Sequence, residues 1–354
     1  MGKAKTLSTL LHTSCTFKEA FENVFGQNKG IPALVCTRWN STPRQISAIT
    51  SLGHQALCNL LEDQVHNELK FSPREWSQLQ ELVAILQPFL EATNLTQVEK
   101  VVTISIVLPS ILSLNHHLED LSKNVRYLNG LVRALKKSLW KRVQGIFVTV
   151  HMMESNQDCT ELPFSDPVYL LSAILDPGFC MMWAEHDVLK TEDVKEKVKK
   201  RAKDCVIYEI SQVSAALLQG DNDQNDGAAS NTDEEREEGV VEKKVPRLFA
   251  GYERKNKSTT NTSVASQFNK YLELCQQFDD RSPNASLNFW LANKNNLSKM
   301  FPVALRVLPV PASSSPVERV FSHGGIIMRP HRAKLSDKTL SNLIFLKCNS
   351  LYMK

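Results

Sequence analysis

The sequence predicts a mainly α-helical protein, and three observations lead to that expectation. Apolar residues recur at helical spacing, as in Trp76, Leu79, Leu82, Val83 and Leu86. Helix start signals, with Ser at the N-cap, Pro at the first helical position and Glu at the third, occur at 72–75 and 315–318. Turn signals separate these stretches, for example Asp176-Pro177-Gly178. At 354 residues the chain can also bury a substantial core.

The first helical stretch runs from Leu7 to Phe25 and ends in the glycine- and proline-containing segment 26–32. Arg38 and Trp39 follow, and Pro43 suits the first turn of another helix. A tryptophan beside an arginine can stack on a nucleic-acid base. Alternatively, Trp39 fills the core where the helical region begins. The sequence leaves both interpretations open.

In the middle of the chain, Pro88 is expected to kink or end the helix that begins after Ser72. In a later helical stretch, 128–150, the basic residues Lys136, Lys137, Lys141 and Arg142 are interleaved with leucines. They form either a basic face for phosphates or an ordinary solvated helix face. A long lysine-rich helix is expected over 187–219.

Segment 219–263 has clustered acidic residues, then basic residues, and few large apolar ones, so we expect a disordered charged loop. The formal charge of +4 is too small to indicate nucleic-acid binding by itself. The 8 cysteines form no CxxC or CxxH pair, which favours reduced thiols over a zinc site. Without an apolar run of about 20 residues, no membrane association is expected.

The most informative stretch lies between Pro309 and Asn349, where two capped helices are predicted. The first is expected to start with a capping box at Ser315 and Glu318 and to end at the glycines 324–325. The second starts at Ser336 and carries the apolar stripe Leu340, Leu343, Ile344 and Leu346, which must be buried against a partner surface.

This stretch, PASSSPVERVFSHGG followed by Arg332, Leu335 and FLKCN, resembles the C-terminal dimerisation region of hAT-family transposases and of zinc finger BED-type proteins derived from them. Segments ALVCTRWNST (33–42), LQPFLEATNLTQVEKVVTISIVLPSI (86–111) and SAILDPGF (172–179) resemble the same family in the same order. The resemblance implies a helical insertion-type domain plus a C-terminal fragment of a ribonuclease-H-like α/β fold. The expected divisions are a partial ribonuclease-H-like lead-in (1–36), the helical domain (37–218), the charged loop (219–263) and the dimerisation region (264–354).

Active family members hold two aspartates and one glutamate that bind two divalent metals for DNA strand transfer. The glutamate corresponds to Glu318, and both aspartates precede the Arg-Trp motif. Here the first aspartate of the sequence is Asp63, after Trp39, and no BED finger is present. We therefore expect a non-catalytic protein, without metal, cofactor or small-molecule substrate, in which Glu318 is vestigial and serves as a helix cap.

The resemblance implies protein dimerisation, most simply as a homodimer, and a location in the nucleus. The residues expected to form the interface are Val310, Val320, Phe321, Leu340, Leu343, Ile344 and Phe345. The alternative is a DNA-binding transposase remnant with a transcription-related role, which would use Arg38, Trp39 and the lysine-rich helices, including Lys136, Lys137, Lys141 and Arg142.

Overall fold

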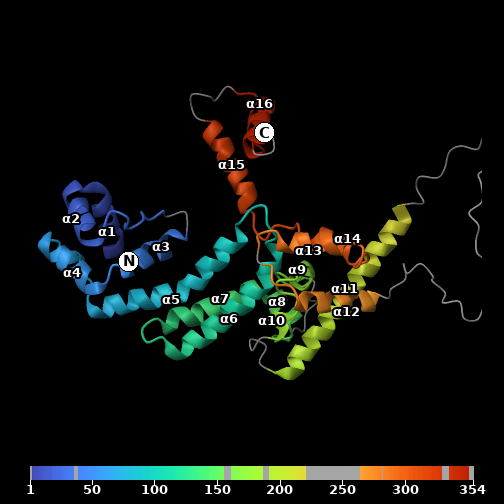
Figure 1. The fold of residues 1–354 in the computed structure, drawn as a ribbon. Helices are drawn as coiled ribbons and strands as arrows, with labels where there is room; N and C mark the ends of the chain where they lie inside the picture. Colours follow the sequence, from blue (N-terminus) through green and yellow to red (C-terminus); the bar gives the residue numbers. More distant parts are fainter. Residues whose placement is uncertain are drawn as a thin grey trace, which may run out of the picture.

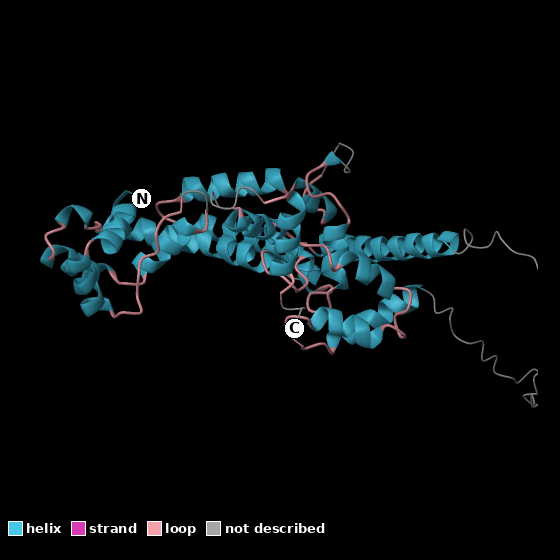
Figure 2. Ribbon diagram, turned by 90° about the horizontal axis from the view of Figure 1, so that it is seen from above, coloured by secondary structure: helices cyan, strands magenta, loops and turns pink. Residues whose placement is uncertain are grey.

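The computed structural model describes residues 2–35, 39–154, 161–185, 191–220, 264–280, 282–328 and 335–350. Within these ranges every regular element is a helix and no strand is present (Figures 1 and 2). The expectation of a mainly α-helical protein is therefore confirmed. A disordered loop was predicted for the charged segment 219–263; residues 219 and 220 are the last two of a helix, and residues 221–263 lie outside the described residues.

Four helices at the N-terminus form a small body with its own core. They are α1 (Gly2–Thr13), α2 (Cys15–Phe25), α3 (Ser41–Thr50) and α4 (His54–Asp63), followed by the short helix η1 (Asn67–Leu69). Ser14 caps α2 by accepting the Phe17 N–H, and Gly26 ends it at φ +90°. Phe17, Phe21, Ile46 and Leu57 are fully or almost fully buried in this core.

The ribonuclease-H-like lead-in predicted for 1–36 is not formed by the described residues. Its apolar residues are spaced for helices, and α1 and α2 bury them. Residues 31–35 form an irregular segment, and the described part of the chain contains no strand that an α/β lead-in would require. A single strand without a partner leaves its backbone groups unpaired, so it is not stable alone.

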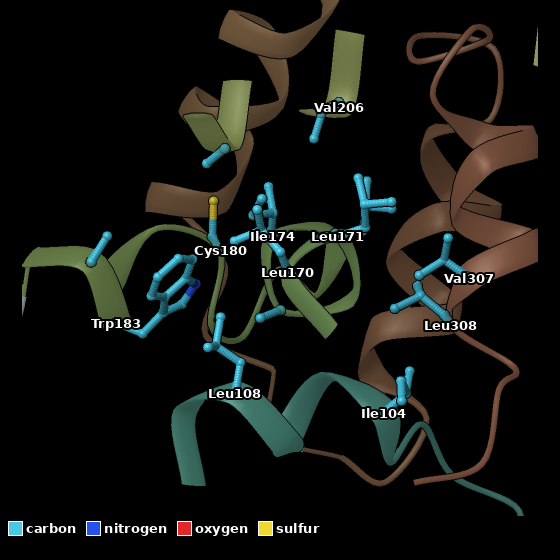
Figure 3. Packing of buried hydrophobic residues seen from close by; sticks show 14 of the residues in the cluster. Ile104, Leu108, Leu170, Leu171, Ile174, Cys180, Trp183, Val206, Val307 and Leu308 are labelled. Atoms are coloured by element: carbon cyan, nitrogen blue, oxygen red, sulfur yellow. The ribbon is translucent and has the colours of Figure 1, made fainter. Parts of the chain in front are cut away.

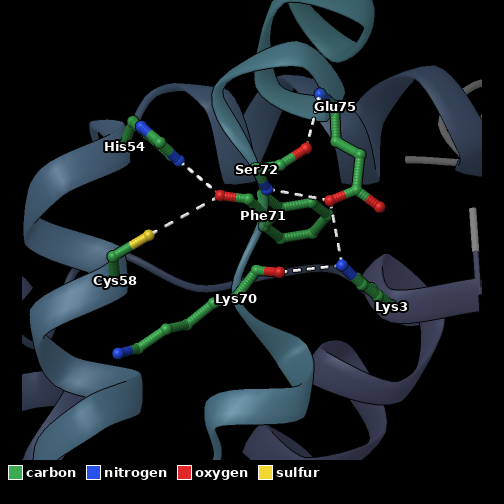
Figure 4. A network of polar contacts seen from close by, with 7 residues as sticks. All are labelled: Lys3, His54, Cys58, Lys70, Phe71, Ser72 and Glu75. Atoms are coloured by element: carbon green, nitrogen blue, oxygen red, sulfur yellow. Dashed lines mark hydrogen bonds and ion pairs between the residues drawn. The ribbon is translucent and has the colours of Figure 1, made fainter.

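Helix α5 (Pro73–Thr96) joins this N-terminal body to the rest of the molecule (Figure 1). Its predicted capping box is present: Glu75 N–H donates to Ser72 Oγ, and the Glu75 carboxylate accepts from the Ser72 N–H. The same carboxylate accepts from Lys3 Nζ at 2.9 Å, and this lysine also donates to the Lys70 carbonyl (Figure 4). The start of α5 is thereby fastened to α1.

Pro88 was predicted to kink or end this helix. It does not end the helix, since α5 continues to Thr96. A proline inside a helix leaves the carbonyl four residues earlier, here that of Ala84, without its usual donor. The ring nitrogen Nε2 of His117 lies 3.1 Å from the Ala84 oxygen and takes the place of that donor. A neighbouring helix therefore compensates for the proline.

That neighbour is α6 (Val107–Asn124), which the short helix η2 (Ile104–Ile106) precedes and which forms a hairpin with α7 (Asn129–Arg142). The connection between the two helices is held by the Glu81 carboxylate of α5. It accepts from the backbone N–H groups of Arg126, Tyr127 and Leu128 at 2.8–3.1 Å. Helices α5, α6 and α7 enclose a small core around Ile85, Leu118 and Val132.

The largest core includes η2 and the first half of α6, with Ile104 and Leu108, and gathers further helices from widely separated parts of the sequence (Figure 3). These further helices are α8 (Gln144–Thr149), α9 (Val168–Leu175), α10 (Met182–Glu185), α11 (Glu192–Gly220), α12 (Val264–Gln276), α13 (Ala285–Asn293) and α14 (Phe301–Val307). Helix α9 has all of its residues from Leu170 to Leu175 buried.

Two aromatic residues, one from α12 and one from α13, donate hydrogen bonds to backbone carbonyls at the end of α9. Tyr271 Oη donates to the Ile174 carbonyl at 2.6 Å, and Trp290 Nε1 donates to the Leu175 carbonyl at 2.8 Å. Asp176 ends α9 and accepts from Ser105 Oγ and the Gly178 N–H, so it is a turn residue, as the sequence indicated. One continuous core thus contains residues from both sides of segment 221–263.

Candidate functional site

The last two helices project from this body as a hairpin (Figure 1). They are α15 (Ser315–Ile327) and α16 (Asp337–Cys348), and they pack against each other. The predicted start of α16 is confirmed, since Ser336 Oγ accepts the Thr339 N–H at 3.3 Å. Residues 329–334, which include Arg332 of the family motif, lie outside the described residues, and Leu335 is the first residue described after them.

The capping box predicted for α15 is wrong. The N-cap is Ser314, not Ser315, and its side chain makes no hydrogen bond to the helix backbone. Instead, the Ser314 hydroxyl and the Glu318 carboxylate are joined at 2.6 Å. Pro316 therefore stands one position further into the helix than the sequence pattern suggested, which shifts the carboxylate away from the N-cap backbone.

The predicted end of α15 at the two glycines is also wrong, because the helix continues through them to Ile327. Gly324 is the one buried residue of α15, and a Cβ atom there would lie 3.1 Å from Ile344 Cδ1 of α16. A Cβ at Gly325 would meet nothing within 4 Å. Gly324 thus allows the two helices to approach closely, instead of terminating the first.

Most of the apolar residues expected at an interface are accessible on this hairpin. The exposed fractions of Phe321 and Phe345 are 73% and 60%. Val310 and Val320 are also exposed, whereas Leu340, Leu343 and Ile344 are half-buried against α15. No residue of α16 is fully buried.

Further exposed apolar residues belong to the same hairpin but were absent from the predicted interface. They are Val317, Ile326, Met328 and Leu346. Val317, Val320 and Phe321 occupy positions i, i+3 and i+4, so they lie on one face of α15. This spacing relative to Val320 and Phe321 is the sequence signal that could have placed Val317 in the predicted interface. We call the exposed residues Val317, Val320, Phe321, Phe345 and Leu346 the apolar hairpin surface.

The hairpin is attached to the end of α5 by polar contacts. Arg319 donates to the Glu99 carboxylate and to the Gln97 carbonyl. Ser313 Oγ donates to the Thr96 carbonyl at 3.0 Å, and the Ala312 N–H donates to Thr103 Oγ1 at 3.0 Å. These bonds set the hairpin at the point where α5 meets the main core.

Beside this attachment lies a pocket of about 570 Å³ that combines two of the sequence motifs. Trp39, just before α3, and Arg44 of α3 line it together with Glu318 and Arg319 of α15. Trp39 is 48% exposed, so the interpretation of this residue as a core filler is wrong. Its neighbour Arg38 lies outside the described residues.

The charges around this pocket are mixed. Arg44 donates to Asn94 Oδ1 at 3.2 Å, and Glu318 is the one carboxylate among the lining residues. In the described part of the chain, no group of three or more His, Cys, Asp or Glu side chains is placed to hold a metal ion.

The four basic residues singled out on the helix 129–142 differ in their surroundings. Lys136 pairs with Glu119 at 2.9 Å, so its charge is compensated. Lys137, Lys141 and Arg142 are exposed. The last two close α7, where cations are favoured by the negative end of the helix dipole.

Comparison with known families bears on the C-terminal part. Residues 267–350 match the model of the hAT family C-terminal dimerisation region. We refer to residues 267–350 as the hAT region. The hAT region begins in α12, continues through α13 and α14 in the main core, and ends just after α16. Its last two helices are therefore the projecting hairpin with the apolar surface.

The search of curated proteins found no match to this chain. Among the described helices, none has both the length and the apolar character that crossing a bilayer requires.

Proposed function

We propose that this chain forms a homodimer through the α15–α16 hairpin of its hAT region, and that it is a non-catalytic, transposase-derived protein of the nucleus. The observation that carries the dimer is the exposure of the large apolar side chains Phe321 and Phe345 on this hairpin. The match of residues 267–350 to the hAT family C-terminal dimerisation region also supports a dimer.

The apolar hairpin surface offers exposed side chains for self-association. It spans both helices, so two hairpins related by a two-fold axis can pack as four helices with equivalent contacts. Phe321 and Phe345 are its largest members, and aromatic residues dominate the energy of many interfaces. Burying such side chains removes apolar area from water at about 25 cal/mol per Å², which drives association.

A charge-introducing pair of variants tests this proposal. Phe321→Asp and Phe345→Asp place a carboxylate in the proposed interface, while both positions are already exposed in the single chain. We expect folded monomers in light scattering, with unchanged helix content. Val24→Asp is the matched control, because Val24 is 53% exposed on α2, outside the hairpin, and should leave the dimer intact.

The non-catalytic part of the proposal is supported by the electrostatics of the pocket at Glu318. The carboxylate is joined to the Ser314 hydroxyl, and Arg44 and Arg319 line the same pocket. Two guanidinium groups disfavour a divalent cation at this place. The test is a DNA cleavage assay with magnesium: activity that Glu318→Gln abolishes would contradict this proposal, and no cleavage above background is expected.

A second candidate function, DNA binding, is favoured by one specific observation. Trp39 presents about half of its surface to solvent beside Arg44 and Arg319, and an accessible indole flanked by guanidinium groups can stack on a base and contact a phosphate. Exposed Lys137, Lys141 and Arg142 would add phosphate contacts. The possible transcription-related role rests on this candidate.

Salt dependence separates the two candidates. If DNA binding is real, affinity should fall steeply as salt rises, because phosphate contacts release counterions. Trp39→Ala should weaken single-stranded DNA binding, whereas Phe321→Asp should change the oligomeric state without removing the Trp39 contact. Nuclear location is tested separately by imaging a fluorescent fusion, and exclusion from the nucleus would contradict it.

A further inference from the structure

A second cavity, of about 660 Å³, shares no lining residue with the hairpin or with the pocket at Trp39. Its lining comes mainly from α10, α11 and α12 and from the turn after α9. Helix α12 carries the start of the hAT region, whereas α10 and α11 precede segment 221–263. Sites for small molecules typically measure roughly 300–1,000 Å³, so this cavity is large enough for an organic ligand.

The wall that α12 contributes is mostly apolar. Phe268, Leu272 and Cys275 line the cavity at positions i, i+4 and i+7, so they share one face of the helix. Met181 and Met182, just before and at the start of α10, extend this lining, and Met182 is 60% exposed. Methionine side chains are flexible and polarizable, so they adapt to the shape of an apolar ligand.

The wall that α11 contributes is charged. Its lining residues recur at positions i, i+3, i+4 and i+7 and are Glu196, Lys199, Lys200 and Lys203. On the other side of the helix, Val198 and Ala202 are buried in the main core. The burial of that side fixes which face of α11 is turned toward the cavity.

The three lysines of this wall differ in their partners. Lys199 is compensated, because it pairs with Glu196 at 3.2 Å and with Glu185 of α10 at 3.7 Å. Lys200 and Lys203 have no ion-pair partner among the described residues, and Lys203 is half-buried. Two uncompensated ammonium groups therefore stand beside an apolar wall.

The sum of these charges selects the ligand. Three lysines and two glutamates line the cavity, so its formal charge is +1. A ligand with one negative charge and an apolar body matches it, because opposite charges attract strongly where water is partly excluded. A phosphate monoester, with about two negative charges, would also be repelled by the two glutamates.

We propose that this cavity binds an aliphatic carboxylate. Its chain lies against Met182 and Leu272, and its carboxylate lies at Lys200 and Lys203. Because these residues belong to α10, α11 and α12, the ligand joins the start of the hAT region to the helices that precede segment 221–263. The proposal is independent of the dimer, since the apolar hairpin surface takes no part in it.

The test is isothermal titration calorimetry of the full chain with decanoate, decanol and decyltrimethylammonium, which share one chain length and differ in charge. We expect decanoate to bind at one site per chain, decanol to bind more weakly and the cation to bind least. Bound decanoate should also raise the melting temperature, because a ligand of the folded state stabilises it. Equal affinity for all three compounds, or no binding of decanoate, would overturn the proposal.

A double variant tests the place of the carboxylate. Lys200→Met with Lys203→Met removes both charges but keeps long apolar side chains. It should weaken decanoate binding roughly fivefold, as expected for partly exposed ion pairs, and leave decanol binding unchanged. The matched control is Lys137→Met with Lys141→Met, which removes two exposed lysines of α7 outside the cavity. Equal affinity of the two double variants for decanoate would contradict the assignment.

Two further variants locate the apolar body of the ligand. Met182→Glu places a carboxylate at an exposed position of the cavity wall, so it should weaken decanoate and strengthen decyltrimethylammonium binding. Phe321→Asp changes the apolar hairpin surface and should leave decanoate binding unchanged. Loss of decanoate binding in Phe321→Asp, with none in Met182→Glu, would place the ligand on the hairpin and overturn the proposal.

Discussion

Arg319, in the first turns of α15, donates hydrogen bonds to the carboxylate of Glu99 and to the carbonyl of Gln97, just beyond the end of α5. This contact connects residues 220 positions apart and fixes the hairpin of the hAT region to the N-terminal half of the chain. The apolar hairpin surface owes its outward position to this contact and to the bonds of Ala312 and Ser313.

Arg319→Gln should loosen the hairpin without unfolding the protein. The ion pair is partly exposed, with 44% and 42% of the two side chains accessible, so its loss should cost less than about 1 kcal/mol of global stability. Amide hydrogen exchange in α15 is expected to accelerate, while exchange in α9 stays unchanged. Arg133→Gln on α7 is the control, and identical exchange in the two variants would contradict this role of Arg319.

Gly324→Val should separate the two helices of the hairpin, because its side chain would enter the space occupied by Ile344. Overpacking of this kind typically costs about 1–3 kcal/mol. Gly325→Ala is a matched control in the adjacent position, where a Cβ meets no neighbour. The expected result is weaker dimerisation of Gly324→Val alone, measured by analytical ultracentrifugation. Equal dimer strength in both variants would show that the close approach is unimportant.

Glu81 should matter for stability more than its place on a helix surface suggests. Its carboxylate accepts three backbone N–H groups between α6 and α7, and hydrogen bonds to a charged group contribute more than neutral ones. We expect Glu81→Ala to lower the free energy of unfolding by about 2 kcal/mol and Glu81→Gln to lower it less. Urea denaturation measures both. Glu91→Ala, which removes only a bond with Gln87, should have a much smaller effect.

Acid should destabilise the junction of α1 and α5 through Glu75 (Figure 4). The hydrogen bond from Lys3, followed by that from the Ser72 backbone, lowers the pKa of Glu75 from 4.5 to about 2. A lowered carboxyl pKa means that the unfolded chain binds the proton first, so this stabilisation is present above pH 4.5 and is lost as pH falls toward 2.

The matching experiment follows stability against pH between 5 and 2 for the wild type, Glu75→Gln and Lys3→Met. Both variants should show a shallower loss over this window, because they lack the charged pair. Glu68→Gln serves as a control carboxylate at the surface. If the free energy of unfolding of Glu75→Gln fell with pH as steeply as that of the wild type, Glu75 would be excluded as the titrating group.

Short sequence motifs correctly predicted the structural features that depend only on residues close together in the sequence. The capping box at Ser72 and Glu75 and the cap at Ser336 are present. The mainly α-helical fold class could be predicted because the spacing of apolar residues is visible within each helical segment separately. The family resemblance found the hAT region but also suggested strands that the described residues do not form.

Other features depend on residues far away and could not be read locally. Pro88 stays inside α5 because His117 lies against the Ala84 carbonyl, and α15 passes Gly324 because Ile344 packs there. The meeting of Trp39 with Arg319 in one pocket likewise needs the tertiary fold. In each case a tertiary contact overrides the preference of a single residue.

The central claim is that the hairpin of the hAT region joins two copies of this chain. The most direct test is the molar mass of the purified wild-type chain, measured by light scattering across a concentration series. We predict a mass that approaches twice that of the single chain as concentration rises, with little dependence on salt because the surface is apolar. A mass equal to one chain at every concentration would contradict the claim.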